Sequence, residues 1–200
     1  MCIRDRSGMI PYYLTNSIDS FSNIFFETMS GYTATGSTIL DDVEALPKSI
    51  IFWRSMTHWL GGMGIIVLAI AILPLLGIGG MQLFSAEVPG SGISGDKIHP
   101  RISATAKRLW LIYFGLTILE TIALSIAGMS FFDALNHSMS NIATGGFSTK
   151  NESLAYWNSI PSIQYIVIFF MILAGTNYLL IYSAITVSYT HLRAHETYPH

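Results

Sequence analysis

Apolar positions gather in three long stretches of the chain, and polar segments separate them. A helix that rises ~1.5 Å per residue needs about 20 apolar residues to cross a hydrocarbon core of ~30 Å. Residues 55–86, 109–132 and 153–192 are each longer than this, and the only Asp, Glu, Lys or Arg among them is Glu120. The pattern therefore predicts three membrane helices, over residues 50–76, 108–128 and 160–182.

Two shorter segments have a different pattern. Residues 18–30 place Phe21, Ile24 and Phe25 on one helical face, but the segment is too short to span a membrane. A run rich in Gly and Thr follows at residues 31–38, and such a run favours irregular backbone. The same order occurs again, with a short helix predicted over 130–142 and a Gly-rich loop over 143–149.

The second copy lies 110 positions after the first (146 − 36 = 110), so the chain contains an internal repeat. Its unit is a short helix, a Gly/Thr loop and a full span. At this offset, identical residues also coincide around the short helices: Ser20 with Ser130, Phe21 with Phe131, Met29 with Met139, and Ser30 with Ser140.

Irregular backbone at membrane depth requires a pore or a protein interior around it, because an unsatisfied peptide group in hydrocarbon costs several kcal/mol. Backbone carbonyls can replace the hydration shell of K⁺ when the chain turns them toward a common axis. Glycine allows the necessary backbone angles and leaves the path free of side chains. Residues 33–36 and 144–146 have this chemistry and carry no charge, so a cation filter is predicted.

Composition supports a lipid environment. Hydrophobic residues make up 51% of the chain and charged residues 11%, with a mean hydropathy of +0.49. A net charge of −2 without a basic cluster excludes nucleic acid as a partner. Cys2 is the only cysteine, so there is no intrachain disulfide or thiolate metal set, and no cofactor is predicted.

The distribution of Lys and Arg predicts orientation. Residues 87–106 carry Lys97 and Arg101, whereas the other connections are acidic or nearly neutral. Under the positive-inside rule this loop is cytoplasmic. Residues 1–6 and 188–200 resemble translated sequencing adapter, so natural protein is expected over about 7–187. The expected organisation is a first repeat over 7–86, the loop over 87–106 and a second repeat over 107–187.

Several polar residues in apolar segments leave two interpretations open. Arg54 and His58 lie one helical turn apart and could line an ion vestibule, or they could bond neighbouring groups or snorkel to the interface. Glu120 could couple transport to a proton or be a hydrogen-bonded structural acid. Glu27 and His137 hold equivalent positions, which predicts packing behind the loops. An intramembrane enzyme using Glu120, His58 and His137 is the alternative from another class, although no catalytic motif supports it.

Longer blocks of sequence make a family resemblance specific. The chain resembles the TrkH/KtrB family of potassium transporters, and the TrkH branch in particular. That family's fold is all-α, with four repeats of membrane helix, pore helix and membrane helix around one pore. The blocks that carry the resemblance are residues 26–38, 52–55, 59–67, 79–87, 100–102 and 143–149.

The resemblance implies a function and a site. The family's central filter glycines correspond to Gly36 and Gly146, and K⁺ would bind the backbone carbonyls of these loops. The chain would supply two of the four repeats, so potassium uptake would be the activity of a longer parent protein. That parent would be a transporter and not an enzyme. A sodium or mixed-cation transporter of the same fold is the alternative within transport. The implied ion-binding residues are Ala34, Thr35, Gly36, Thr144, Gly145 and Gly146.

The resemblance also implies partners. The parent would form a homodimer in the bacterial inner membrane, in contact with lipid. A cytoplasmic nucleotide-binding regulatory subunit, TrkA-like, would dock on the side of residues 87–106.

Overall fold

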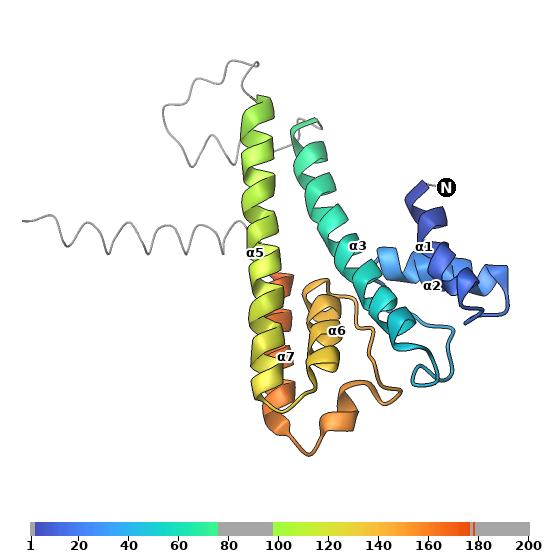
Figure 1. Ribbon diagram of the computed structural model, residues 1–200. Coiled ribbons are helices and arrows are strands. Elements are labelled where there is room, and N and C mark those ends of the chain that lie inside the picture. Colours follow the sequence, from blue (N-terminus) through green and yellow to red (C-terminus); the bar gives the residue numbers. More distant parts are fainter. Residues whose placement is uncertain (1–2, 76–97, 177, 179–200) are drawn as a thin grey trace, which may run out of the picture. The chain divides into compact units, whose positions relative to one another are not determined.

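The computed structural model describes residues 3–75, 98–176 and 178. In this part of the chain all regular secondary structure is helical, and loops join the helices (Figure 1). Side chains are described for residues 7–64, 107–176 and 178. No strand occurs in these ranges, so the predicted all-α class is confirmed. The helices are α1 (Ile3–Leu14), α2 (Phe21–Tyr32), α3 (Lys48–Leu75), α5 (Ile98–Ile126), α6 (Phe131–Ile142), the 3₁₀ helix η2 (Ser153–Trp157) and α7 (Pro161–Gly175).

The helix bounds differ from the sequence expectations mainly at α5. This helix begins at Ile98, ten residues before the expected start at 108 (108 − 98 = 10), and therefore includes residues 98–106 of the expected loop. α3 keeps Pro74 inside its last turn. The block 79–87, most of the expected span end at 176–182 and the adapter-like stretch 188–200 lie outside the described residues.

The chain divides into two compact units. The first consists of residues 1–62 and 113–177, and the second of residues 63–112 and 178–200. Both short helices, both Gly/Thr loops and the facing parts of α3 and α5 belong to the first unit. All contacts described below lie within it.

The two repeats fold alike. α2 and α6 have the same length and begin and end 110 positions apart (131 − 21 = 110, 142 − 32 = 110). Serine precedes each helix, and Ser130 caps α6 by accepting a hydrogen bond from Asp133 N. At the other end, Thr35 N donates to Ser30 O over 3.1 Å, and Gly145 N donates to Ser140 O over 2.8 Å. These bonds satisfy helix carbonyls that would otherwise lack a partner.

Each repeat has its own apolar cluster, which holds its short helix in place. The buried core of the first repeat joins α1, α2 and α3, and that of the second joins α5, α6, η2 and α7. The first cluster consists of Met9, Tyr12, Ile18, Ile24 and Ile50, and the second of Leu124, Met129, Ala134, Trp157, Ile163 and Val167.

Two adjacent glycines on α3 let the ends of both short helices approach that helix. A Cβ on Gly61 would overlap the carbonyl oxygen of Tyr32, the last residue of α2. A Cβ on Gly62 would lie 3.1 Å from Ala143, the C-cap residue of α6. α3 therefore contacts the C-terminal ends of both α2 and α6, where the two loops begin.

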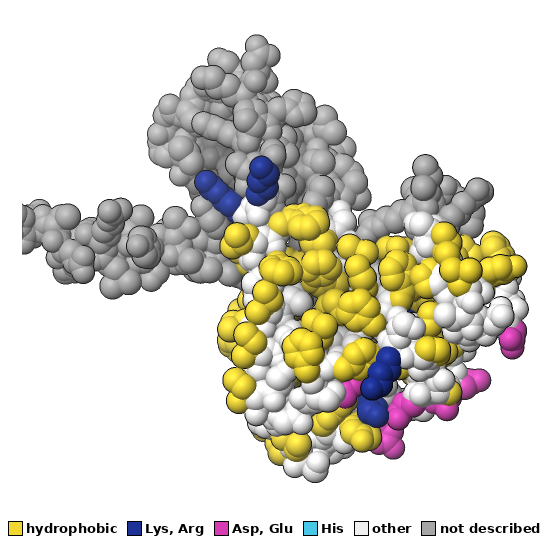
Figure 2. Space-filling view, in the orientation of Figure 1, with side chains coloured by type: hydrophobic (Ala, Val, Ile, Leu, Met, Phe, Trp, Pro, Cys, Tyr) yellow, Lys and Arg dark blue, Asp and Glu magenta, His cyan; other side chains and the backbone are white. Residues whose placement is uncertain are grey.

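Large apolar side chains remain exposed along α5 and α7, and Figure 2 shows apolar atoms over much of the described surface in its view. Leu111 is 75% exposed and Ile172 is 62% exposed, which is unusual for a protein in water but suits hydrocarbon. Within the described residues, one segment is long and apolar enough to cross a membrane, Lys107–Ile126.

The close approach at Gly61 gives a prediction. Gly61→Ala should destabilise the fold by about 1–3 kcal/mol, because the backbone carbonyl of Tyr32 cannot rotate away as a side chain could. Gly115→Ala in α5 is the matched control, since its Cβ would meet nothing within 4 Å and alanine favours a helix by roughly 1 kcal/mol. Thermal unfolding in detergent should show a lower Tm only for Gly61→Ala. Equal Tm values would contradict the close approach.

Candidate functional site

Both Gly/Thr loops have the same unusual backbone. Ala34 and Thr144 have φ values of 52° and 56°, and Gly36 and Gly146 have values of 78° and 94°. Each pair is 110 positions apart, so left-handed residues occupy the same two places in each loop. Non-glycine residues reach this region at a cost of about 1 kcal/mol or more, and surrounding structure must hold them there. Ala34 and Thr144 each follow the C-cap of a short helix, and the bonds from Thr35 N to Ser30 O and from Gly145 N to Ser140 O close the helix end around them.

The two loops meet at their glycines. A Cβ on Gly36 would overlap the carbonyl oxygen of Gly145, so this oxygen lies directly beside the first loop. A Cβ on Gly146 would meet no described atom within 4 Å. Backbone of one loop thus packs on backbone of the other, and glycine is required for that contact at position 36.

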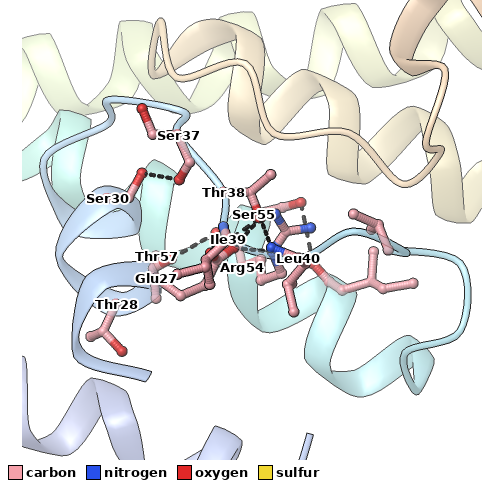
Figure 3. Close-up of polar contacts among 12 residues, drawn as sticks. Glu27, Thr28, Ser30, Ser37, Thr38, Ile39, Leu40, Arg54, Ser55 and Thr57 are labelled. Atoms are coloured by element: carbon pink, nitrogen blue, oxygen red, sulfur yellow. Dashed lines mark hydrogen bonds and ion pairs between the residues drawn. The ribbon is translucent and has the colours of Figure 1, made fainter. Parts of the chain in front are cut away.

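A charged cluster, which consists of Glu27, Thr38 and Arg54, lies behind the first loop (Figure 3). Arg54 Nε donates to Glu27 Oε1 over 2.8 Å, and both side chains are almost fully buried. Arg54 Nη2 donates to Thr38 Oγ1 over 3.1 Å, while Thr38 Oγ1 donates to Glu27 Oε1 over 3.0 Å. Glu27 Oε2 also accepts from the backbone N–H of Ile39 over 3.1 Å. The cluster therefore fixes the chain just after Gly36.

The second repeat has a neutral pair in the equivalent place. His137 and Ser148 are the counterparts of Glu27 and Thr38 (137 − 27 = 110, 148 − 38 = 110), and Ser148 Oγ lies 3.3 Å from His137 Nε2. Gln164 is the counterpart of Arg54 (164 − 54 = 110), but it donates to Asn158 rather than to the pair. Glu27 and His137 thus pack behind their loops, as the repeat predicted.

The polar segments that follow the loops are also joined. Asn151 Oδ1 accepts from Val43 N over 2.7 Å, and Asn151 Nδ2 donates to Asp42 Oδ1 over 2.8 Å. The bond from Asn151 lowers the pKa of the Asp42 carboxyl. Lys150 Nζ donates to Glu44 Oε2 over 3.2 Å, which raises the pKa of Lys150. These bonds are a second connection between the two repeats, in addition to the contact between the loops at Gly36 and Gly145.

Glu120 is a buried structural contact between helices. Its Oε1 accepts from Asn141 Nδ2 over 2.7 Å, and Asn141 also contacts Val167 O over 3.2 Å. The bonds connect α5, α6 and α7 at the last turn of α6, just before the second loop begins. Among the described residues, Glu120 Oε2 has no hydrogen-bond partner.

The structure does not assemble the three residues of the enzyme alternative into a site. His58 Nδ1 contacts Ser140 Oγ over 3.1 Å, His137 contacts Ser148, and Glu120 contacts Asn141. No group of three or more His, Cys, Asp or Glu among the described residues could hold a metal ion. Arg54 and His58 are 1% and 0% exposed, so neither snorkels to the interface within the described part.

Sequence reasoning missed the partners of these buried groups. Ser140, Asn141 and Phe147 carry no charge and look like ordinary helix or loop residues in the sequence. The offset of 110 could have identified Thr38 and Ser148, because each lies two residues after a loop glycine.

Two short helices that end in left-handed glycine loops, packed among longer apolar helices, define a membrane protein of the kind that has re-entrant pore repeats. The family model described as "TrkH: Cation transport protein" matches residues 2–196. The chain therefore belongs to the TrkH family, as the sequence resemblance predicted.

Individual relatives agree with this placement. The Trk system potassium uptake protein TrkH of Salmonella typhimurium is 49% identical over 180 residues, which cover 90% of this chain and 37% of the relative. The protein of the same name from Vibrio parahaemolyticus is 46% identical over 179 residues, or 89% of this chain and 36% of the relative. The crystal structure of the potassium transporter TrkH from Vibrio parahaemolyticus matches with a TM-score of 0.79 and 40% identity, over 94% of this chain and 37% of that one.

The relatives are longer than this chain. The chain spans about 37% of the length of the curated relatives it matches. The fold class and family are shared across that length, and the relatives are named as transport proteins.

The charged cluster gives a second prediction. Glu27→Gln should destabilise the protein by about 3–5 kcal/mol, because it leaves the Arg54 guanidinium buried without its counter-charge. The triple variant Glu27→His, Thr38→Ser, Arg54→Gln copies the second repeat into the first and removes both charges. It should be more stable than Glu27→Gln alone. Thermal unfolding measures both, and a triple variant that is less stable than Glu27→Gln would contradict the equivalence of the two sets.

Proposed function

We propose that this chain contributes two pore repeats to a longer bacterial potassium-uptake transporter, with the ion passing along residues 31–38 and 143–149. One observation carries the proposal, which is the repeated left-handed geometry at Ala34 and Gly36 and again at Thr144 and Gly146. Alternation of ordinary and left-handed residues changes the direction of successive carbonyls, as a carbonyl filter requires. Neither loop carries a charged side chain.

Backbone oxygens of both loops would replace water around K⁺. α2 and α6 lead directly into the loops, so the partial negative charge at their C-terminal ends would favour a cation there. A mobile ion needs attraction that is weak enough for release, which neutral carbonyls provide. The proposed ion-binding residues are Ala34, Thr35, Gly36, Thr144, Gly145 and Gly146.

Relatives named as potassium uptake proteins support K⁺ as the transported ion. Two loops supply only part of a ring of carbonyls, and the chain spans about 37% of those relatives, so further repeats would come from the rest of the parent. The proposed organisation is a first repeat over 7–86, a connection over 87–106 and a second repeat over 107–187. The activity is transport without catalysis or a cofactor.

The proposed setting is the bacterial inner membrane, with residues 87–106 on the cytoplasmic side. The basic character of that connection supports its orientation. The relatives are named as parts of a Trk system, which supports partnership with other subunits. We assign a homodimer and a TrkA-like nucleotide-binding subunit to the parent on the family resemblance.

Replacement of the loop glycines tests the proposal in the full-length parent, the transporter that contains this segment. Gly146→Ser and Gly36→Ser should lower the ratio of K⁺ to Na⁺ uptake by about tenfold, because a side chain at a left-handed position disturbs the carbonyls. Uptake of both ions would be measured in cells that lack their own potassium systems. Gly115→Ala is the control outside the loops.

The outcome distinguishes the two transport alternatives. A wild-type parent that takes up Na⁺ as well as K⁺ would support the mixed-cation alternative. Unchanged ratios in both glycine variants, at normal membrane abundance, would refute a filter at these loops.

A further inference from the structure

Phe147, the residue after Gly146, packs on α3 of the first repeat. Its ring stacks on the imidazole of His58 with a centroid distance of 3.8 Å and an interplanar angle of 11°. On the same helix, one turn away, the guanidinium carbon of Arg54 lies 4.2 Å from the centre of the Phe147 ring. Phe147 is 4% exposed, so the contact is buried. The second loop is thus attached through one side chain to two residues of the first repeat.

His58 also contacts two further parts of the second repeat. Its Nδ1 lies 3.1 Å from Ser140 Oγ near the end of α6. Gly145 lies so close to the imidazole that any Cβ at that position would overlap it. His58 therefore sets the position of the second loop on both sides of Thr144.

Arg54 reaches the first loop through Nη2, which donates to Thr38 Oγ1. The bonds to Glu27 and Thr38 described above fix the chain after Gly36. One buried side chain consequently contacts both loops, through hydrogen bonds on one side and through the Phe147 ring on the other. Because the charge of Arg54 is neutralised by Glu27, it can occupy this place without an unpaired charge in the interior.

We propose that Arg54 and His58, acting through Phe147, are positioning residues that set the separation of the two pore loops and thereby the ion selectivity of the parent. The proposal rests on the proposed function. The Gly145 carbonyl lies beside Gly36, so any shift of one loop relative to the other changes the spacing of the oxygens that an ion would meet. Selectivity in a carbonyl filter depends on the number and arrangement of those oxygens.

The repeat supplies an internal comparison. Ser37, Gln164 and Ile168 occupy the positions equivalent to Phe147, Arg54 and His58 (147 − 37 = 164 − 54 = 168 − 58 = 110). Gln164 donates to Asn158, and Ile168 is 46% exposed. The three residues that join the loops have therefore diverged from their counterparts in type and in contacts.

Two small changes at the contact test the proposal in the full-length parent. Phe147→Leu keeps an apolar side chain but removes the stacked ring, and Ser140→Ala removes the hydroxyl that His58 contacts. Each should lower the ratio of K⁺ to Na⁺ uptake by up to about fivefold. That factor corresponds to about 1 kcal/mol, the free energy of a stacked pair or a buried hydrogen bond, if all of it acts on the preference between the two ions. Their combination with His58→Asn should give less than the product of the single effects, because the residues form one contact.

Membrane abundance and the ratio of K⁺ to Na⁺ uptake separate the two possible roles. A positioning residue changes the ratio in protein that reaches the membrane, whereas a merely structural residue changes only the abundance. Ile168→Ala, at the position equivalent to His58, is the matched control and should keep the wild-type ratio. If Phe147→Leu fails to reach the membrane, Ser140→Ala decides, because it removes a single atom from a side chain that is 1% exposed.

Two results would overturn the inference alone. One is a wild-type K⁺ to Na⁺ ratio in Ser140→Ala and in any Phe147→Leu that reaches the membrane, alongside a lowered ratio in Gly146→Ser. The other is reduced uptake of both ions by the same factor. A wild-type parent that shows no preference for K⁺, with no effect of Gly146→Ser, would instead refute the proposed function.

Discussion

Backbone that leaves the helix inside an apolar environment must find partners for its polar groups, and the arrangement of this protein follows from that constraint. The Gly/Thr loops begin where α2 and α6 end, so the first loop N–H groups bond helix carbonyls that would otherwise be unsatisfied. The rest of each loop needs support from the side. α3 provides it to both loops, because Gly61 and Gly62 allow the helix ends to come close and Arg54 and His58 fill the space beside them.

Much of this arrangement could be predicted from the sequence. Apolar length predicted three spans, of which Lys107–Ile126 is the one described segment long and apolar enough to cross a membrane. The offset of 110 located two equivalent short helices, which the structure places at Phe21–Tyr32 and Phe131–Ile142. Gly36 and Gly146 were identifiable because glycine at matching places in two loops points to a shared backbone requirement, and both have positive φ. The pattern within each segment was sufficient for these features, since a helix or a left-handed glycine is determined mainly by residues near it in the sequence.

Contacts between the repeats could not be predicted in the same way. Phe147 and His58 are 89 positions apart (147 − 58 = 89), and neither carries a pattern that indicates the other. The start of α5 was also predicted too late, at residue 108, because the basic connection before it suggested a loop, whereas the helix begins at Ile98. Charged residues near a membrane surface are compatible with a continuous helix, so charge marks the edge of the hydrocarbon rather than the end of the helix.

The replacement of a charged cluster in one repeat by a neutral pair in the other bears on how the two halves evolved. A duplication produces two units that are interchangeable at first. Once Arg54 contacts Phe147 across the boundary, each unit carries half of a shared contact, and a copy of either one placed in the other position would lack its partner. Drift at residue 147 is then restricted by residues 54 and 58, so the halves of this chain are expected to change together over evolutionary time despite their separate cores.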